Sequence, residues 1–318
     1  MQSYSLFAPA KINLHLEIIG DRPDGYHELV MIMQSVALGD VIDLRANGKE
    51  KIRLFCPNSQ VPLDNTNLAY KAAALMQENF PSQAHNFGGI DIHIEKNIPI
   101  SAGLAGGSTD AAAVLVGINL LWGLGLTQPE LQELGAILGS DVPFCIGGGS
   151  AIATGRGEQV EPLPDLHDMW VILAKYSNIS VSTGWAYKTY REKFHHLYVE
   201  DSHGVSQRTH AVHSGALVKA IAHQNKEKIG ELLYNDLQKV VLPEYLEVEK
   251  LIKKFQTKKV LGTMMSGSGP TVFALCNNET EANQIKETIA KEINNPNLDL
   301  WVTKICPHGI VTQKKVIN

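Results

Sequence analysis

The stretch "SAGLAGGSTDAAA", residues 101–113, places glycines, hydroxyls and one acid directly before an apolar run. The N-terminus of a helix exposes unpaired backbone N–H groups and carries about half a positive charge from aligned peptide dipoles. Glycines there let the backbone approach an anion closely, and hydroxyls can contact a phosphate or a metal ion. This stretch therefore predicts a phosphate-binding loop that opens a helix, with tight helix packing as the alternative reason for the glycines.

The loop differs from the two commonest nucleotide-binding motifs, because it lacks both the Gly-Lys-Ser/Thr ending of a Walker A loop and G-x-G-x-x-G. It resembles the phosphate loop of the GHMP kinases, a superfamily named for galactokinase, homoserine, mevalonate and phosphomevalonate kinases. That loop reads roughly Pro-x-x-x-Gly-Leu-Gly/Ala-Gly-Gly-Ser-Ser. The matching residues are Pro99, Gly103, Leu104, Ala105, Gly106, Gly107, Ser108 and Thr109, the last in place of the usual second serine. The resemblance implies that they bind ATP and that Ser108 contacts Mg²⁺.

Two further stretches extend this resemblance over nearly the whole chain. "SGSGPTVFAL", residues 266–275, is similar to the third GHMP motif, and "PAKINLHLEIIGDRPDGYHEL", residues 9–29, resembles the N-terminal signature of the members that phosphorylate 4-diphosphocytidyl-2-C-methyl-D-erythritol. "GSDVPFC", "VSTGWAY" and "NDLQKVVLPEY" resemble segments of the same members in the same order. The resemblance implies transfer of the ATP γ-phosphoryl group to the 2-hydroxyl of that alcohol, a step of the non-mevalonate isoprenoid pathway.

The resemblance also assigns the chemistry to Asp141 and Lys11. Taken alone, Asp141 is an acid in a turn and Lys11 is a solvated lysine on a strand, although Asn13 shares its face of that strand. The family pattern implies that Asp141 is the catalytic base and that Lys11 orients it and stabilises the transferring group. A nearby lysine would also keep the carboxylate ionised.

The resemblance also indicates which residues bind the cytidine of the substrate. The resemblance implies that Tyr26 stacks on the cytosine and that His27 reads the edge of the base by hydrogen bonds. We expect Tyr187 on the opposite face of the base, with Thr183 and Asn13 in the same pocket. Ordinary half-buried packing is the alternative for both tyrosines.

The elements that must position these residues are strands and helices in irregular order. Alternation in "KINLHLEI" predicts a half-buried strand over 11–18, and Asn47-Gly48 between two further strand patterns predicts a hairpin of 41–46 with 51–56. Thr127-x-x-Glu130 predicts a capping box at the start of a helix. We expect an α+β protein with a strand-rich N-terminal nucleotide-binding domain, residues 1–160, and a C-terminal α+β domain, residues 161–318.

One segment, residues 191–213, has no counterpart in the family pattern. It holds five of the 12 histidines, but they lack the spacing of metal ligands. We expect a solvated loop.

Composition excludes several other classes of protein. A net charge of −5 without a basic run argues against nucleic-acid binding, and the longest apolar stretch is too short to span a membrane. The four separated cysteines and the lack of a visible signal peptide predict reduced thiols in a cytoplasmic protein. We expect small-molecule partners and leave open a monomer or a weak homodimer.

Two rival interpretations are another small-molecule kinase of the superfamily and a nucleotide-binding module without catalysis. The N-terminal phrase argues against the first, and the presence of both Lys11 and Asp141 argues against the second.

Overall fold

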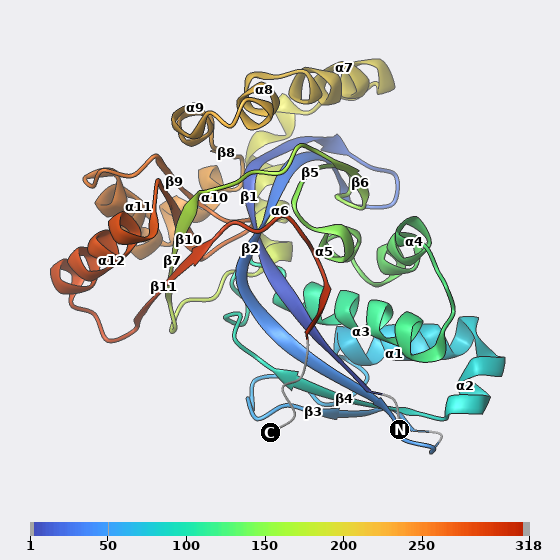
Figure 1. The fold of residues 1–318 in the computed structure, drawn as a ribbon. Helices are drawn as coiled ribbons and strands as arrows, with labels where there is room; N and C mark the ends of the chain where they lie inside the picture. Colours follow the sequence, from blue (N-terminus) through green and yellow to red (C-terminus); the bar gives the residue numbers. More distant parts are fainter. Residues whose placement is uncertain (1–2, 50, 314–318) are drawn as a thin grey trace.

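The computed structural model describes residues 3–49 and 51–313, which form two β-sheets with helices packed around them (Figure 1). The larger sheet has eight strands, and its main path runs β12-β1-β2-β4-β3, with β5 and β6 continuing from β2 and β8 beside β1. These strands are β1 (Ser3–Asp21), β2 (His27–Ala46), β3 (Arg53–Phe55), β4 (Ile90–Glu95), β5 (Ser150–Gly155), β6 (Gln159–Pro162), β8 (Tyr234–Asn235) and β12 (Val311–Gln313).

The long antiparallel pair of β1 and β2 forms the middle of this sheet. Their register runs from Ser3 opposite Arg45 to Asp21 opposite His27, with irregularities on the way. The alternation in residues 11–18 predicts a strand with one buried and one solvent-exposed face. The strand is present, but the prediction of an exposed face was wrong. Lys11 and Asn13 on the polar face are buried as well, because loops and helices cover them.

The smaller sheet has four antiparallel strands in the order β11-β7-β10-β9. They are β7 (Trp170–Tyr176), β9 (Gly262–Met265), β10 (Val272–Cys276) and β11 (Leu298–Lys304). Helices α11 (Leu246–Gln256) and α12 (Glu279–Ile293) pack on it through apolar faces, while the C-terminal strand β12 returns to pair with β1. The mixture of strands and helices confirms the α+β class. The boundary near residue 160 stays a prediction.

The remaining helices fall into two groups. The first group lies against the larger sheet and comprises α1 (Leu68–Asn79), α2 (Pro81–Phe87), α3 (Gly106–Trp122), α4 (Gln128–Leu138) and α5 (Val142–Gly147). The predicted capping box of α4 is confirmed, with the Thr127 backbone N–H donating to Glu130 Oε2 over 2.8 Å. The second group comprises α6 (Thr183–Phe194), α7 (Ser202–His213), α8 (Ala216–Ala222), α9 (Lys226–Glu231) and α10 (Gln238–Glu244).

Two local predictions were wrong. The strand β3 does not form a hairpin with β2; it pairs in parallel with β4, because β4 occupies the edge of β2 from Val41 to Ala46. Residues 191–213 are not a solvated loop. They contain the end of α6, the short helix η1 (His195–Leu197) and α7, whose N-terminus is capped by the Asp201 side chain. Among the described residues, no helix is long and apolar enough to cross a membrane.

Candidate active site

A cleft of about 860 Å³ lies where several segments meet. They include the loop before α3, the turn between β1 and β2, the start of α6, the loop before α5 and the turn at 266–270. Most of the predicted site residues line it: Lys11, Tyr26, His27, Pro99, Gly103, Ala105, Gly106, Gly107, Ser108, Asp141, Thr183 and Tyr187. Asn13, Leu104 and Thr109 do not.

The predicted catalytic pair is brought together in the middle of the cleft. Lys11 Nζ lies 3.6 Å from Asp141 Oδ2 and donates a hydrogen bond of 2.7 Å to Asn13 Oδ1. Lys11 is only 4% exposed, whereas the Asp141 side chain is 30% exposed. Asn13 thus lies outside the cleft and holds the lysine from behind, while Asp141 faces the space that a substrate would fill.

The loop before α3 leaves its backbone N–H groups free, as an anion-binding loop requires. Ala105 precedes the helix with φ of 59°, and no side chain caps this N-terminus. In contrast, side chains cap α1, α6 and α12. The uncapped positive end of α3 lines the cleft and can therefore accept a phosphate.

The residues of this loop have three different surroundings. Gly103, with φ of 74°, faces the turn at 266–270, since a Cβ there would lie 2.3 Å from the Ser266 carbonyl oxygen. Leu104 is buried, and its carbonyl accepts the Lys11 backbone N–H over 3.2 Å. Thr109 is fully buried beside Cys145, so its hydroxyl does not reach the cleft. Ser108 lines the cleft, as does Ser101 earlier in the loop.

A buried charge cluster, which no sequence pattern indicated, lies beside the predicted phosphate loop. Lys96 Nζ lies 2.6 Å from Asp40 Oδ2 and 2.7 Å from Asp110 Oδ2. Burial opposes the charge of Lys96, but the two carboxylates raise its pKa above the usual value. Burial raises the pKa of Asp110, and Asp40 adds to this effect. A lone acid at the start of an otherwise apolar helix was the signal that could have revealed Asp110.

At one end of the cleft, aromatic and cationic side chains gather near the turn between β1 and β2. Tyr26 is 53% exposed, and the Arg156 guanidinium carbon lies 5.2 Å from its ring centroid. The rings of His27 and Tyr187 lie 5.1 Å apart, so Tyr187 packs against the histidine. Thr183 Oγ1 lies 2.9 Å from Ser268 Oγ and ties α6 to the turn at 266–270.

His27 is held as a neutral ring at this end. Burial lowers its pKa and the Arg191 guanidinium lowers it further, while Asp21 opposes both. Three cationic residues that the sequence analysis missed, Arg156, Lys188 and Arg191, also line the cleft and could face negative charge on a ligand.

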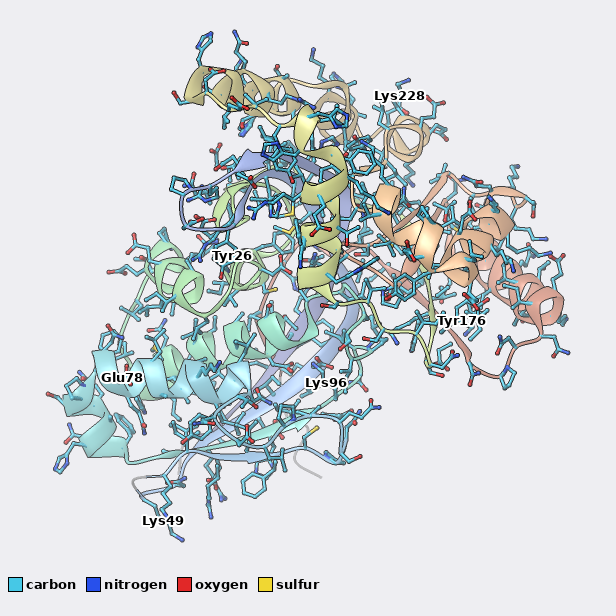
Figure 2. The ribbon with its side chains drawn as sticks, turned by 180° about the vertical axis from the view of Figure 1, so that it is seen from behind. Tyr26, Lys49, Glu78, Lys96, Tyr176 and Lys228 are labelled. Carbon is cyan, nitrogen blue, oxygen red and sulfur yellow. The ribbon has the colours of Figure 1, made fainter. Side chains whose placement is uncertain are left out.

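The cleft continues past the phosphate loop to the start of α1, where the sequence analysis predicted no contacts. Its walls there combine apolar and amide groups: Gln60, Val61, Pro62, Thr66, Asn67 and Leu68. Figure 2 labels Tyr26 and Lys96, which mark the turn between β1 and β2 and the neighbourhood of the phosphate loop.

The sequence matches two family profiles, GHMP kinases N terminal domain over residues 67–149 and GHMP kinases C terminal over residues 217–295. The chain therefore belongs to the GHMP kinases.

Some members of this family are much more similar in sequence to this chain than others. The 4-diphosphocytidyl-2-C-methyl-D-erythritol kinase of Gloeothece citriformis is 59% identical over 98% of both chains, and that of Nostoc punctiforme is 56% identical over 99% of this chain and all of its own. A crystal structure of 4-(cytidine 5'-diphospho)-2C-methyl-D-erythritol kinase superposes with a TM-score of 0.72 at 29% identity, covering 95% of this chain and 98% of the other. A homoserine kinase from Cytophaga hutchinsonii has a TM-score of 0.73 at 21% identity, over 98% of each chain, and shares the fold.

Proposed function

We propose that this protein transfers the γ-phosphoryl group of ATP to the 2-hydroxyl of 4-diphosphocytidyl-2-C-methyl-D-erythritol, a step of the non-mevalonate isoprenoid pathway. The observation that carries the proposal is one cleft in which Tyr26 and His27 at one end and the phosphate loop at the other meet at Lys11 and Asp141. The near full-length identity to enzymes of that name supports the choice of substrate.

The catalytic step follows from the pair in the middle of the cleft. Phosphoryl transfer has a loose transition state, so the protein mainly positions the reactants and neutralises charge. Asp141 faces the cleft and accepts the proton of the attacking 2-hydroxyl. Lys11, fixed by Asn13, lies 3.6 Å from this carboxylate and stabilises the oxygens of the transferring group.

ATP binds along the other half of the cleft. Its phosphates accept hydrogen bonds from the free N–H groups at the start of α3, where the helix dipole favours negative charge. Its adenosine occupies the apolar and amide walls at the start of α1, around Asn67 and Leu68. The two ends of the cleft are thereby assigned to the two substrates.

Magnesium would accompany the ATP phosphates, and the residues present fit this ion. Mg²⁺ takes one or two protein oxygens and otherwise substrate phosphates and water, so a cage of several carboxylates is not required. The Ser108 hydroxyl lines the cleft, and Asp110 Oδ1 is a buried oxygen without a hydrogen-bond partner among the described residues. These two groups would hold the ion, which supplies neutralisation of phosphate charge when bound.

The cytidine diphosphate half of the substrate lies at the turn between β1 and β2. Tyr26 stacks on the base, Tyr187 supports His27 from behind, and Arg156, Lys188 and Arg191 face the diphosphate. The four cysteines form no disulfide, which agrees with the predicted cytoplasmic location.

The decisive experiment is an assay of ADP formation with purified protein, ATP and Mg²⁺. The cytidine diphosphate alcohol should be turned over, and EDTA should stop the reaction. Mevalonate, homoserine and galactose serve as competing acceptors from the same superfamily. Comparable turnover of any of them would overturn the assignment.

A further inference from the structure

The turn between β5 and β6 directs Arg156 into the cleft. Arg156 stands between Gly155 and Gly157, whose φ angles are 70° and 106°, values that residues with a Cβ rarely adopt. The Gly157 backbone N–H donates to the Thr154 carbonyl oxygen over 3.0 Å, and the Arg156 backbone N–H donates to Glu158 Oε2 over 2.8 Å. Because these bonds fix the backbone of the turn, the Arg156 side chain leaves it in a defined direction.

The side chain of Arg156 joins this turn to two other parts of the protein. Its Nη2 donates over 2.9 Å to the Ala136 carbonyl oxygen in the last turn of α4, where carbonyl groups lack partners within the helix. Its guanidinium carbon lies over the Tyr26 ring, 5.2 Å from the centroid. The two turns are neighbours in the sheet, since Gly155 pairs with Leu29 near the start of β2. The guanidinium is thus held by α4 while it covers one face of the ring.

The backbone of Tyr26 is anchored more firmly than its ring. Its N–H donates to Asp24 Oδ1 over 3.1 Å, and its carbonyl oxygen accepts from the Arg22 backbone N–H over 2.9 Å. The residue is 53% exposed, and among the described residues the Arg156 guanidinium is the charged group that lies over its ring. An exposed side chain samples several rotamers, and a ligand that must fix one of them binds less tightly. Attraction between the cation and the ring favours the rotamer that keeps the two in contact.

We propose that Arg156 is a positioning residue that covers one face of the Tyr26 ring and holds the other face open for the cytosine. A ring has two faces, and a cation on one of them leaves the second for stacking with a base. Arginine suits this task because its planar guanidinium can donate to Ala136 and lie against a ring at once, whereas a lysine ammonium is a point charge. The stacking of cytosine rests on the function proposed above; the order of the ring does not.

The first test measures the order of the Tyr26 ring without any substrate, by NMR relaxation of ¹³C-labelled tyrosine. The wild-type ring should have a higher order parameter than the ring in Arg156→Ala, because the variant lacks the group that covers it. Arg156→Lys should also lower the order parameter, since the ammonium cannot keep both contacts. Equal order of the ring in Arg156→Ala and wild type overturns the proposal even if the kinase assay succeeds.

The second test measures the Kd of cytidine, which has no phosphates, because the function proposed above also directs Arg156 at the diphosphate. Arg156→Ala should raise this Kd roughly 2- to 5-fold, the usual effect of a cation over an exposed ring. In the Tyr26→Ala background the same change should have no further effect. Lys188→Ala is the matched control, because Lys188 lines the same cleft but lies 3.9 Å from Glu192 and not over Tyr26.

The control should keep the wild-type Kd for cytidine. An equal loss in Lys188→Ala, or a full effect of Arg156→Ala in the Tyr26→Ala background, would show a general effect of charge and overturn the proposal. A loss with CDP but not with cytidine would assign Arg156 to the diphosphate alone and would also overturn it.

If Arg156→Ala does not fold, Arg156→Met replaces it, since this change keeps most of the stem and removes the charge. Absence of cytidine binding and of turnover in the wild-type protein would instead contradict the proposed function. The order of the Tyr26 ring would then still decide the role of Arg156.

Discussion

The two halves of the substrate path are built in different ways. At the proposed reacting end, Lys11 lies within a long central strand at 4% exposure and donates a hydrogen bond to the fully buried Asn13. At the proposed base-binding end, Tyr26 sits on a turn at 53% exposure, and His27 packs against the rings of Tyr187 and Tyr198 from a distant segment. The comparison teaches that the sheet itself holds the proposed catalytic lysine, whereas the proposed base-binding residues lie on a turn and depend on side chains from a distant segment.

The sharpest way to test the preformed end is Asp141→Asn, which keeps the shape and removes the charge and basicity. Folding and binding of both substrates should survive because Asp141 is partly exposed and Lys11 is also held by Asn13. We expect kcat to fall roughly 10²- to 10⁴-fold, the usual contribution of a general base. Single-turnover rates measure this effect, and a near-normal rate would remove Asp141 from the chemistry.

A double-mutant cycle tests whether Lys11 and Asp141 act as one unit across their 3.6 Å separation. Lys11→Ala alone should lower turnover strongly, because it removes the positive charge beside both the base and the transferring group. The double variant should be far less impaired than the product of the two single effects predicts. Strictly multiplicative losses would instead show two independent roles.

The base-binding end should respond differently to Tyr26→Ala. Loss of stacking on the base should raise the KM for the cytidine substrate roughly 5- to 150-fold, from about 1 to 3 kcal/mol, while the KM for ATP hardly moves. Tyr26 is exposed, so the free energy of unfolding should stay close to that of wild type. A shift in the ATP constant alone would place the tyrosine in the other half of the cleft.

The smallest expected effect is the difference between alanine substitutions at Gly106 and Gly107, two neighbouring glycines of the proposed phosphate loop. A Cβ on Gly106 would lie 3.1 Å from Lys96 Nζ and 3.2 Å from Ile98 Cγ2, whereas one on Gly107 would meet only Leu68 Cδ1 at 3.8 Å. Gly107→Ala should therefore stabilise the helix by up to about 1 kcal/mol yet weaken ATP binding, while Gly106→Ala should destabilise the fold. Thermal unfolding and the KM for ATP measure both changes, and equal stability of the two variants would contradict this reading of the loop.

The sequence predicted best what local patterns encode. The Thr127 capping box, the glycine loop before a helix and the α+β class depend on neighbours along the chain or on the family pattern, and the structure agrees. What could not be predicted depends on pairing between distant residues. The apolar period of residues 11–18 could not show that loops bury Lys11, and the hairpin signal at Asn47-Gly48 could not show that β4 takes the edge of β2.

The site residues that the sequence did not reveal also depend on contacts between distant parts of the chain. Arg191 lies 170 positions from Asp21, and Lys96 is paired with Asp40 across 56 positions, so neither contact leaves a local pattern. The sequence of residues 191–213 predicted a solvated loop because it is rich in histidines and charged residues. Its few apolar residues, such as Val205 and Val212, nevertheless pack against the core.

The return of the chain to its first strand has a consequence for biosynthesis. Residues Ser5–Phe7 of β1 have two neighbours in the sheet, β2 on one side and Val311–Gln313 of β12 on the other. During translation the first neighbour emerges early, but the second is made about 300 residues later. Until then this edge of the nascent sheet exposes unpaired N–H and C=O groups, the kind of surface that chaperones shield and that pairs with other chains. A chain truncated before residue 311 would therefore lack this second neighbour and leave the backbone edge of Ser5–Phe7 unpaired.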